Sequence, residues 1–310
     1  MFVVKGIVFS ALKFVVCLLF FPPCFCNFER LKHTVMNSSI NIKGRLLAMD
    51  TPRVMGILNV TPDSFFEGSR VNAGEELVER ARKMLADGAD ILDVGACSTR
   101  PSGEPVSEEE ELARLHSALD LLDEHLPDAV VSLDTFRGRV ARECALRHNV
   151  SIINDVSGFD WCADMFPVVA ELNIPYVLTH SVGWAGDAAQ YGNFLPDVLA
   201  ALAKKMWQLR QAGVKDVIVD PGFGFGKSVE QNYEMLASLS VFGELEAPVL
   251  AGLSRKSMIT KLLGISSAEA LPETAALNMV ALQGGAAILR VHDVREAANV
   301  VKMFNALKGV

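Results

Sequence analysis

Short apolar runs recur along the chain, and a helical pattern separates each run from the next. The runs cover residues 54–60, 89–95, 129–133, 151–153, 175–178, 216–219, 248–253 and 286–289. Their residues are continuously apolar rather than alternating, which is typical of strands buried on both faces of a parallel sheet. The pattern therefore predicts eight such strands.

The intervening segments have the period of amphipathic helices. In residues 73–87, Leu77, Ala81 and Leu85 recur at a spacing of four, and Gly88 follows as a helix stop. Comparable patterns cover residues 107–126, 137–148, 164–172, 195–212, 228–240, 272–284 and 295–307. Each predicted strand is thus followed by a predicted helix.

This alternation, at roughly 25 to 40 residues per unit, indicates right-handed parallel crossovers. The roughly 260 residues after Pro52 match the usual length of one eightfold barrel. An open doubly wound sheet is the alternative, but eight units are long for it and the first turn has no Gly-x-Gly-x-x-Gly pattern. We expect an α/β fold, a (β/α)8 TIM barrel with outer helices, as a single domain over residues 49–310.

The N-terminus differs from the rest of the chain. Residues 1–26 are nearly all apolar, with Lys5 and Lys13 near the front, as in a signal peptide or a membrane anchor. The apolar core after Lys13 is only about eight to twelve residues, whereas roughly 20 are needed to span a bilayer. Translation from Met36 or Met49 is the alternative. We treat residues 1–48 as an apolar leader or extended N-terminus and do not expect membrane attachment.

The cysteines and the net charge indicate the cell compartment and the class of ligand. Three of the six cysteines lie in the leader, and the scattered three that remain form no disulfide framework. This favours a cytoplasmic protein. A formal charge of −8 argues against nucleic acid as a partner, so anionic ligands would need local basic groups.

Polar side chains end the apolar runs. The carboxylates and amides at these ends are Asn59, Asp93, Asp134, Asn154, Asp155 and Asp220. The active site of a parallel barrel lies where the carboxyl ends of the strands converge. An aspartate beside an asparagine can bind a flat heterocycle that carries amino and ring N–H donors. For any one carboxylate, capping of the following helix is the alternative.

Basic groups follow the last two runs. Arg255 and Lys256 come after the seventh, while Arg290 and His292, two residues apart, point to the same side at the end of the eighth. The loops after strands seven and eight are the usual phosphate site of such barrels, and a guanidinium beside an imidazole suits a diphosphate oxygen. Either residue alone could instead be a structural partner.

Residues 220–227 read DPGFGFGK. The glycine order fits neither a Walker A loop nor a dinucleotide fingerprint, so we interpret it as tight backbone near a ligand held by Asp220. Lys227 is either solvated or functional. Two further loops, residues 61–70 and 97–107, are long and rich in Gly, Pro and Ser, as mobile lids of barrel enzymes often are.

Six strings in this order, MGILNVTPDSF, STRP, IIND, DPGFGFGK, SRKSMI and RVHDV, resemble the dihydropteroate synthase family over residues 53–307. The resemblance implies condensation of 6-hydroxymethyl-7,8-dihydropterin diphosphate with 4-aminobenzoate, with Mg²⁺ as cofactor and a homodimer as the assembly. It implies no acid–base pair, because the arylamine is already nucleophilic and diphosphate is a good leaving group. We therefore assign no catalytic residue.

The resemblance also assigns roles to positions of this chain. Asp134, Asn154, Asp220 and Lys256 would hold the pterin, with Arg255 along the face of its ring. Arg290 and His292 would hold the diphosphate, with Thr99 and with Asn59 acting through Mg²⁺. The aminobenzoate site would be completed by Phe65, Arg100, Pro101 and Ser257.

Several positions depart from the family pattern, among them Ser102 after Pro101 and the run of residues 66–69 in the first loop. Ala96 and Cys97 replace a common Gly-Glu pair, and Thr179 stands where a methionine usually precedes the histidine. Two other functions therefore stay open: a pterin-dependent methyltransferase barrel, and a non-catalytic pterin-binding paralogue. Only the synthase would release diphosphate.

Overall fold

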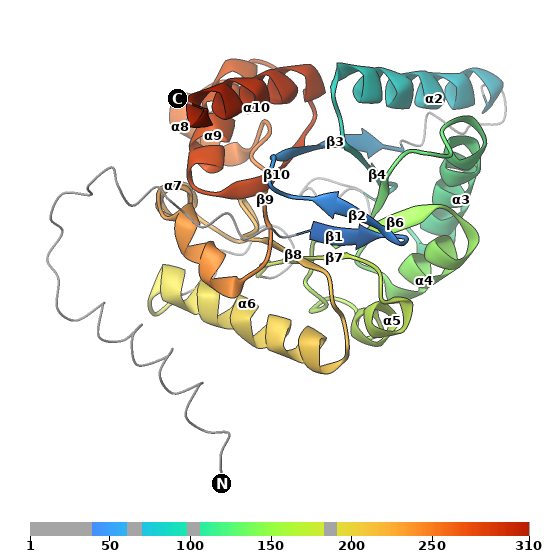
Figure 1. Cartoon of the computed structure of the whole chain (residues 1–310), viewed down its shortest axis with the longest axis horizontal. Coiled ribbons are helices and arrows are strands. Elements are labelled where there is room, and N and C mark those ends of the chain that lie inside the picture. The colour runs from blue at the N-terminus through green and yellow to red at the C-terminus, as the bar shows by residue number, and fades with distance from the viewer. Residues whose placement is uncertain (1–38, 61–69, 98–105, 183–190, 310) are drawn as a thin grey trace, which may run out of the picture. The chain divides into compact units, whose positions relative to one another are not determined.

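The computed structural model describes residues 39–60, 70–97, 106–182 and 191–309. Its centre is a closed barrel of parallel strands in the order β10-β3-β4-β5-β6-β7-β8-β9, with helices around the outside (Figure 1). The predicted TIM barrel is confirmed. The strands are β3 (Arg53–Asn59), β4 (Ile91–Gly95), β5 (Val131–Asp134), β6 (Val150–Asp155), β7 (Tyr176–Thr179), β8 (Val217–Asp220), β9 (Val249–Ala251) and β10 (Ala286–Val291).

Each crossover carries at least one helix. The helices are α2 (Arg70–Asp87), α3 (Glu108–His125), α4 (Gly138–Arg147), α5 (Met165–Leu172), α6 (Phe194–Gln211), α7 (Val229–Ala237), η3 (Leu239–Leu245), α8 (Ser257–Leu263), α9 (Leu271–Gln283) and α10 (Val294–Lys308). None of the helices in these described ranges combines the length and apolarity needed to cross a bilayer.

Successive strand residues face opposite sides of the sheet. On β7, Leu178 belongs to the large cluster between strands and helices, whereas Val177 belongs to a smaller cluster with Ile91, Ile152 and Ile218. The smaller cluster fills the barrel interior near the start of the strands. Because side chains alternate, the residues two positions further along each strand also face inward, closer to the carboxyl end.

A hairpin precedes the barrel. β1 (Ser39–Ile42) pairs with β2 (Arg45–Ala48), and Lys43 and Gly44 both have positive φ, as two-residue hairpin turns require. Ile40 and Ile42 are buried in the inner cluster, so the hairpin covers the amino end of the barrel. Residues 39–48 therefore lie in the same compact unit as the barrel, although the sequence grouped them with the leader. Residues 1–38 lie outside the described residues.

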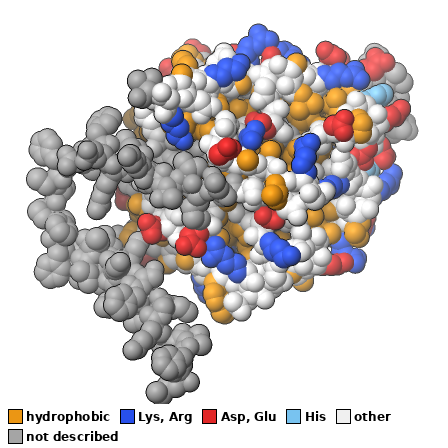
Figure 2. All heavy atoms as spheres, in the orientation of Figure 1, with side chains coloured by type: hydrophobic (Ala, Val, Ile, Leu, Met, Phe, Trp, Pro, Cys, Tyr) orange, Lys and Arg blue, Asp and Glu red, His pale blue; other side chains and the backbone are white. Residues whose placement is uncertain are grey.

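The surface carries mixed charge. Basic and acidic side chains are interspersed on the face that Figure 2 shows. This face therefore has no single large basic patch, in keeping with the net charge of −8.

Candidate active site

Inward-facing polar side chains from four strands form one network at the carboxyl end of the barrel. Arg290 on β10 donates from Nε to Asp93 Oδ2 on β4 at 2.7 Å and from Nη2 to Asp134 Oδ2 on β5 at 2.5 Å. Asn154 on β6 donates from Nδ2 to the same Asp93 oxygen at 3.0 Å. The second oxygen of Asp93 is buried and has no hydrogen-bond partner among the described residues, which leaves an acceptor for a ligand donor.

Burial and charge act against each other in this network. Burial raises the pKa of Asp134 to about 7, although Arg290 beside it acts in the opposite direction. Burial also disfavours the charged form of Arg290, but the Asp93 and Asp134 carboxylates hold its pKa above the usual value. Arg290 therefore stays cationic in a buried position, where it can bind an anion strongly.

Asp220 and Lys256 lie around the glycine-rich loop after β8. The amide of Gly222 donates to Asp220 Oδ1 at 2.7 Å, and Lys256 Nζ donates to the Phe223 carbonyl. A Cβ at Gly222 would lie 2.0 Å from the His180 carbonyl oxygen, so the loop requires glycine there. Burial lowers the pKa of Lys256 to about 8, with Asp220 opposing the shift. The predicted tight backbone beside Asp220 is present.

Arg255 is held in a fixed plane. Its Nε and Nη2 donate to the two oxygens of Asp293 at 2.8 and 2.9 Å, and Nη1 donates to the carbonyls of Ser267 and Ala268. His292 Nδ1 lies 3.0 Å from Ser254 Oγ, which in turn accepts from the His292 amide. Four of the five N–H donors of Arg255 are thus in use, and the flat faces of the guanidinium are left for stacking.

Two more predicted positions lie at element ends. Asn59 is the last residue of β3 and is exposed, and Ser257 is the exposed first residue of α8. Among the described residues, no group of three His, Cys, Asp or Glu side chains could hold a metal ion. A metal bound near Asn59 would need oxygen ligands from a substrate.

Asp155 does not join the network. Its carboxylate accepts from the amides of Ser157 and Phe159, from the Ser157 hydroxyl and from the Tyr176 hydroxyl at 2.7 to 2.8 Å. These bonds fasten the turn after β6 to β7. Asp155 is therefore a structural carboxylate, but it does not cap the following helix, because α5 begins only at Met165, after Asp164.

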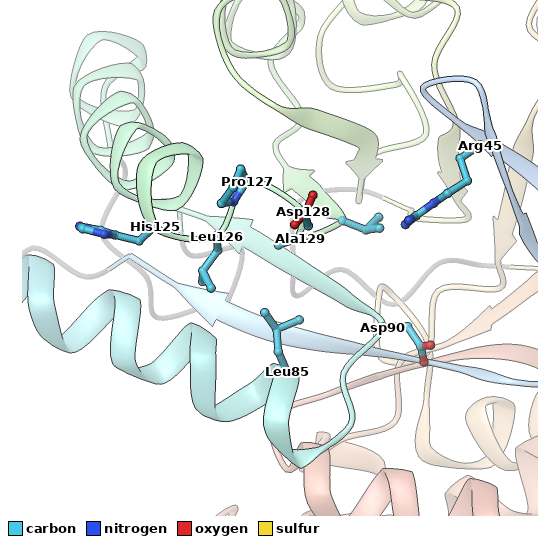
Figure 3. Close-up of a pocket in the computed structure, with 9 residues that line it drawn as sticks. Arg45, Leu85, Asp90, His125, Leu126, Pro127, Asp128 and Ala129 are labelled. Carbon is cyan, nitrogen blue, oxygen red and sulfur yellow. The ribbon is translucent and has the colours of Figure 1, made fainter.

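A separate cavity of about 350 Å³ lies at the opposite end of the barrel, before β4 and β5 (Figure 3). The side chains around it are those of Arg45, Leu85, Asp90, His125, Leu126, Pro127, Asp128, Ala129 and Val130. The Asp90 carboxylate is already used, because it accepts from Arg53 Nη1 and the Val54 amide. This cavity is not part of the candidate active site.

Comparison with known proteins decides the family. A family described as pterin binding enzyme matches residues 55–292. The dihydropteroate synthases of Clostridium beijerinckii and Bacillus subtilis are 41% and 39% identical to this chain, over 81% and 82% of its length and 92% and 88% of theirs. The chain belongs to the dihydropteroate synthase family. It is accordingly a transferase.

Solved structures of dihydropteroate synthases have the same architecture. The Xanthomonas albilineans enzyme with 4-aminobenzoic acid matches with a TM-score of 0.80 and 37% identity, over 88% of this chain and 98% of that one. The Yersinia pestis enzyme, in a sulfonamide drug complex, matches with a TM-score of 0.80 and 33% identity, over 88% of this chain and 100% of that one.

The structure brings together five of the nine described positions that the dihydropteroate synthase resemblance assigned. The network contains Asp134, Asn154 and Arg290, and Asp220 and Lys256 lie around the neighbouring loop. The assigned residues that lie outside the described residues are Phe65, Thr99, Arg100 and Pro101. Cys97, at one of the departures from the family pattern, is half-buried, and burial together with Glu111 raises the pKa of its thiol, so the thiol is protonated at neutral pH.

The resemblance to dihydropteroate synthase assigned no role to three residues near the rim, although Asp93 was among the candidate strand-end carboxylates. Asp93 is central to the network, and its spacing of two from the apolar Ile91 could have predicted its inward direction. Thr179 faces inward beside Asp220, and its buried hydroxyl has no partner within the described part of the chain. Lys227 is not solvated: its ammonium contacts three backbone carbonyls. No pattern in the sequence distinguishes that arrangement from an exposed lysine.

Proposed function

We propose that this chain condenses 6-hydroxymethyl-7,8-dihydropterin diphosphate with 4-aminobenzoate to give 7,8-dihydropteroate and diphosphate. The observation that carries the proposal is the buried Arg290–Asp93–Asn154–Asp134 network at the carboxyl end of the barrel, in a chain of the dihydropteroate synthase family. It places acceptors for a heterocycle beside a cation for the leaving group.

The pterin would occupy the space above the network. Asp220, oriented by the Gly222 amide, would accept from the amino group and ring N–H of the pyrimidine edge. Asp134, Asn154 and Lys256 would form hydrogen bonds with the other polar atoms of the pterin. Arg255, held in plane by its bidentate pair with Asp293, would lie along the ring face.

The diphosphate would bind on the side of Arg290 and His292, together with Thr99. A single protein oxygen at Asn59 is compatible with Mg²⁺, because this ion favours oxygen ligands, keeps several waters and usually binds substrate phosphates rather than an all-protein cage. Asn59 would supply the protein oxygen. When bound, the ion neutralises negative charge on the diphosphate.

The residues then act mainly by position and charge. The bond between the pterin methylene and the diphosphate oxygen breaks with its electron pair leaving on the diphosphate, which Arg290 stabilises. The amine lone pair of 4-aminobenzoate forms the new C–N bond, and the released proton goes to solvent. Holding the two reactants together supplies the rest of the acceleration, so no side chain needs to act as a general base.

4-Aminobenzoate would be held by Phe65, Arg100, Pro101 and Ser257. The structure of the Xanthomonas albilineans relative with 4-aminobenzoic acid supports this substrate class. Ser257 begins α8, and N–H groups at a helix start favour a carboxylate.

We further propose a cytoplasmic homodimer without nucleic acid or membrane partners. The three cysteines in the described part of the chain are unpaired, as is usual in a reducing compartment. Val280 on α9 and Met303 and Leu307 on α10 are exposed apolar side chains on adjacent helices. A second copy packing there would remove them from water.

The test is diphosphate release by the full chain, with pterin diphosphate and Mg²⁺, with and without 4-aminobenzoate. Release should require 4-aminobenzoate. Arg290→Ala should lower kcat/KM by about 10²- to 10³-fold, because a buried charge contact to the leaving group is lost. The matched control is Arg295→Ala, since Arg295 is an exposed side chain that pairs with Asp87 on the outer surface.

The two other functions share one outcome. Pterin binding without diphosphate release would replace the synthase with the non-catalytic paralogue or the pterin-dependent methyltransferase barrel. Release that ignores 4-aminobenzoate, or an equal loss in both arginine variants, would contradict the proposed chemistry.

A further inference from the structure

The side chain of Lys227 ends in a cage of backbone oxygens. Its Nζ donates to the carbonyls of Gly222 at 2.7 Å, His180 at 3.0 Å and Phe225 at 3.1 Å. An ammonium has three N–H donors and no acceptor, so these three carbonyls use its full capacity. Burial lowers the pKa of Lys227 to about 7, with Asp220 opposing the shift. Only the protonated form can satisfy all three oxygens.

Two of the three caged carbonyls, those of Gly222 and Phe225, come from an unusual stretch of backbone, whereas the third, that of His180, follows β7. Gly222, Gly224 and Gly226 have φ values of 75°, 85° and 61°, so the chain reverses repeatedly between β8 and α7. Such turns direct several carbonyls to the same side, where regular secondary structure cannot pair them. Without Lys227, the Gly222 carbonyl would keep its bond from the Phe225 amide at 3.2 Å, whereas the carbonyls of Phe225 and His180 would lose the ammonium that they accept from.

A second side chain holds the same loop. Asn232 on α7 accepts from the Gly224 amide at 2.7 Å and donates to the Ser228 carbonyl at 2.6 Å. It is 1% exposed. The loop is therefore held at Gly222 and Phe225 by an ammonium and at Gly224 by a neutral amide.

The loop in turn orients two residues of the candidate site. The Gly222 amide donates to Asp220 Oδ1, and the Phe223 carbonyl accepts from Lys256 Nζ. Lys256 Nζ also lies 4.7 Å from the centre of the Phe225 ring. A shift of the loop would move the carboxylate and the ammonium that face the heterocycle together.

We propose that Lys227 is a positioning residue for the pterin site, acting through the loop of residues 221–226, with Asn232 as its neutral counterpart. The proposal rests on the proposed function, because it takes Asp220 and Lys256 as pterin ligands. Lys227 touches the loop backbone rather than the substrate. Its loss should therefore weaken pterin binding more than it changes any other step.

Charge alone offers a different explanation, since removing Lys227 also removes a cation near Asp220. A variant of Asn232 distinguishes an effect of charge from an effect of loop position. Asn232→Ala releases the Gly224 amide without changing any charge, so it should reproduce the Lys227 defect only if loop position is what matters. The two residues act through one loop, so their effects should also be less than additive.

The experiment measures the Kd of 6-hydroxymethylpterin by calorimetry, and the Michaelis constants of both substrates in the diphosphate-release assay, for the full chain. The variants are Lys227→Met, Asn232→Ala and their double. Lys205→Met is the matched control, because Lys205 donates to the Gly158 carbonyl at 2.8 Å in the neighbouring loop after β6. Thermal midpoints are recorded for all of them.

We expect Lys227→Met and Asn232→Ala to raise the pterin Kd about 10- to 100-fold, the cost of a misplacement of roughly 1 Å. The Michaelis constant for the arylamine substrate should stay within about twofold, because that substrate does not contact the loop. Lys205→Met should bind pterin like the wild type at a comparable thermal midpoint. The double variant should be little worse than either single.

Three results would overturn the inference: an unchanged pterin Kd in Lys227→Met, an equal rise in Lys205→Met, or normal binding in Asn232→Ala. If Lys227→Met does not fold, Asn232→Ala alone decides, because it leaves every charge in place. A wild type that binds no 6-hydroxymethylpterin would instead contradict the proposed function. The two failures are thereby distinguished.

Discussion

At the scale of single residues, direction along the strand decides what a polar side chain does. Asn154 and Asp155 are consecutive on β6, yet Asn154 joins the inward network, whereas Asp155 faces the helices and bonds the Tyr176 hydroxyl. Both are buried. The period of two therefore places a candidate ligand next to a purely structural carboxylate.

His180, just after β7, gives a residue-scale prediction. Burial first, and then the nearby Lys227 and Lys205 ammonium groups, lower its pKa from 6.5 to about 3. The folded protein keeps this ring neutral while the unfolded chain takes up a proton below pH about 6.5, so stability present above that pH is lost as the pH falls. We expect a loss of about 1 kcal/mol between about pH 7.5 and 5.5 from this residue.

Urea unfolding across that range measures the loss. In His180→Gln the pH dependence should be shallower by this amount. His125→Gln is the control, because His125 is exposed and its removal should leave the curve unchanged. Equal slopes in the wild type and His180→Gln would show that the His180 ring is protonated in the folded protein.

At the scale of elements, the apolar runs predicted all the barrel strands, and the polar residues after them predicted the rim. The side-chain contacts between distant strands could not be predicted from these local patterns. Arg290 and Asp93 are 197 positions apart, and they meet only because β10 closes on β3, which places β4 within reach of the Arg290 side chain. Likewise, nothing local shows that Arg255 pairs with Asp293, 38 positions away. Such contacts depend on closure and register.

A buried ion pair joins α3 to the loop after β5. Glu111 on α3 is 0% exposed, accepts from Thr135 Oγ1 at 2.7 Å, and pairs with Arg137, which also donates to the Val106 carbonyl at 2.6 Å. Glu111→Gln would leave the Arg137 charge without its partner. We expect a loss of about 3 kcal/mol in the free energy of unfolding.

The comparison is with an exposed pair of the same kind. Arg142 and Glu171 make a bidentate pair with both side chains 51% exposed, so Glu171→Gln should have no measurable effect. Adding Arg137→Met to Glu111→Gln should recover part of the loss, because an apolar side chain needs no counter-ion. The assignment of a structural role to this pair fails if Glu111→Gln is as mild as Glu171→Gln.

At the scale of the whole molecule, the two ends of the barrel have separate tasks. The carboxyl end carries the polar network, whereas the amino end is covered by the β1–β2 hairpin and its apolar side chains. Barrels of this kind commonly divide function and stability in the same way. Changes at the hairpin should therefore alter stability without altering the chemistry.

This separation can be tested by comparing chains that begin at Met36 and at Met49. The shorter chain lacks Ile40 and Ile42, which are 1% and 6% exposed, and uncovers inner residues such as Met55 and Ile152. Burial of an isoleucine contributes about 1.5–3 kcal/mol, so the Met49 chain should lose several kcal/mol in urea unfolding and aggregate more readily. The Met36 chain should match the full chain.

Point variants test the loss of a buried side chain without shortening the chain. Ile40→Ala in the full chain should cost about 2–5 kcal/mol, whereas Leu46→Ala, at a hairpin position that is 68% exposed, should cost little. For each variant, the pterin Kd and the kcat of the folded fraction should equal those of the wild type, since the hairpin lies at the far end of the barrel from Arg290. A fall in kcat that tracks the loss of stability would mean that the amino end also shapes the rim, and the two ends would then have to be treated as one cooperative unit.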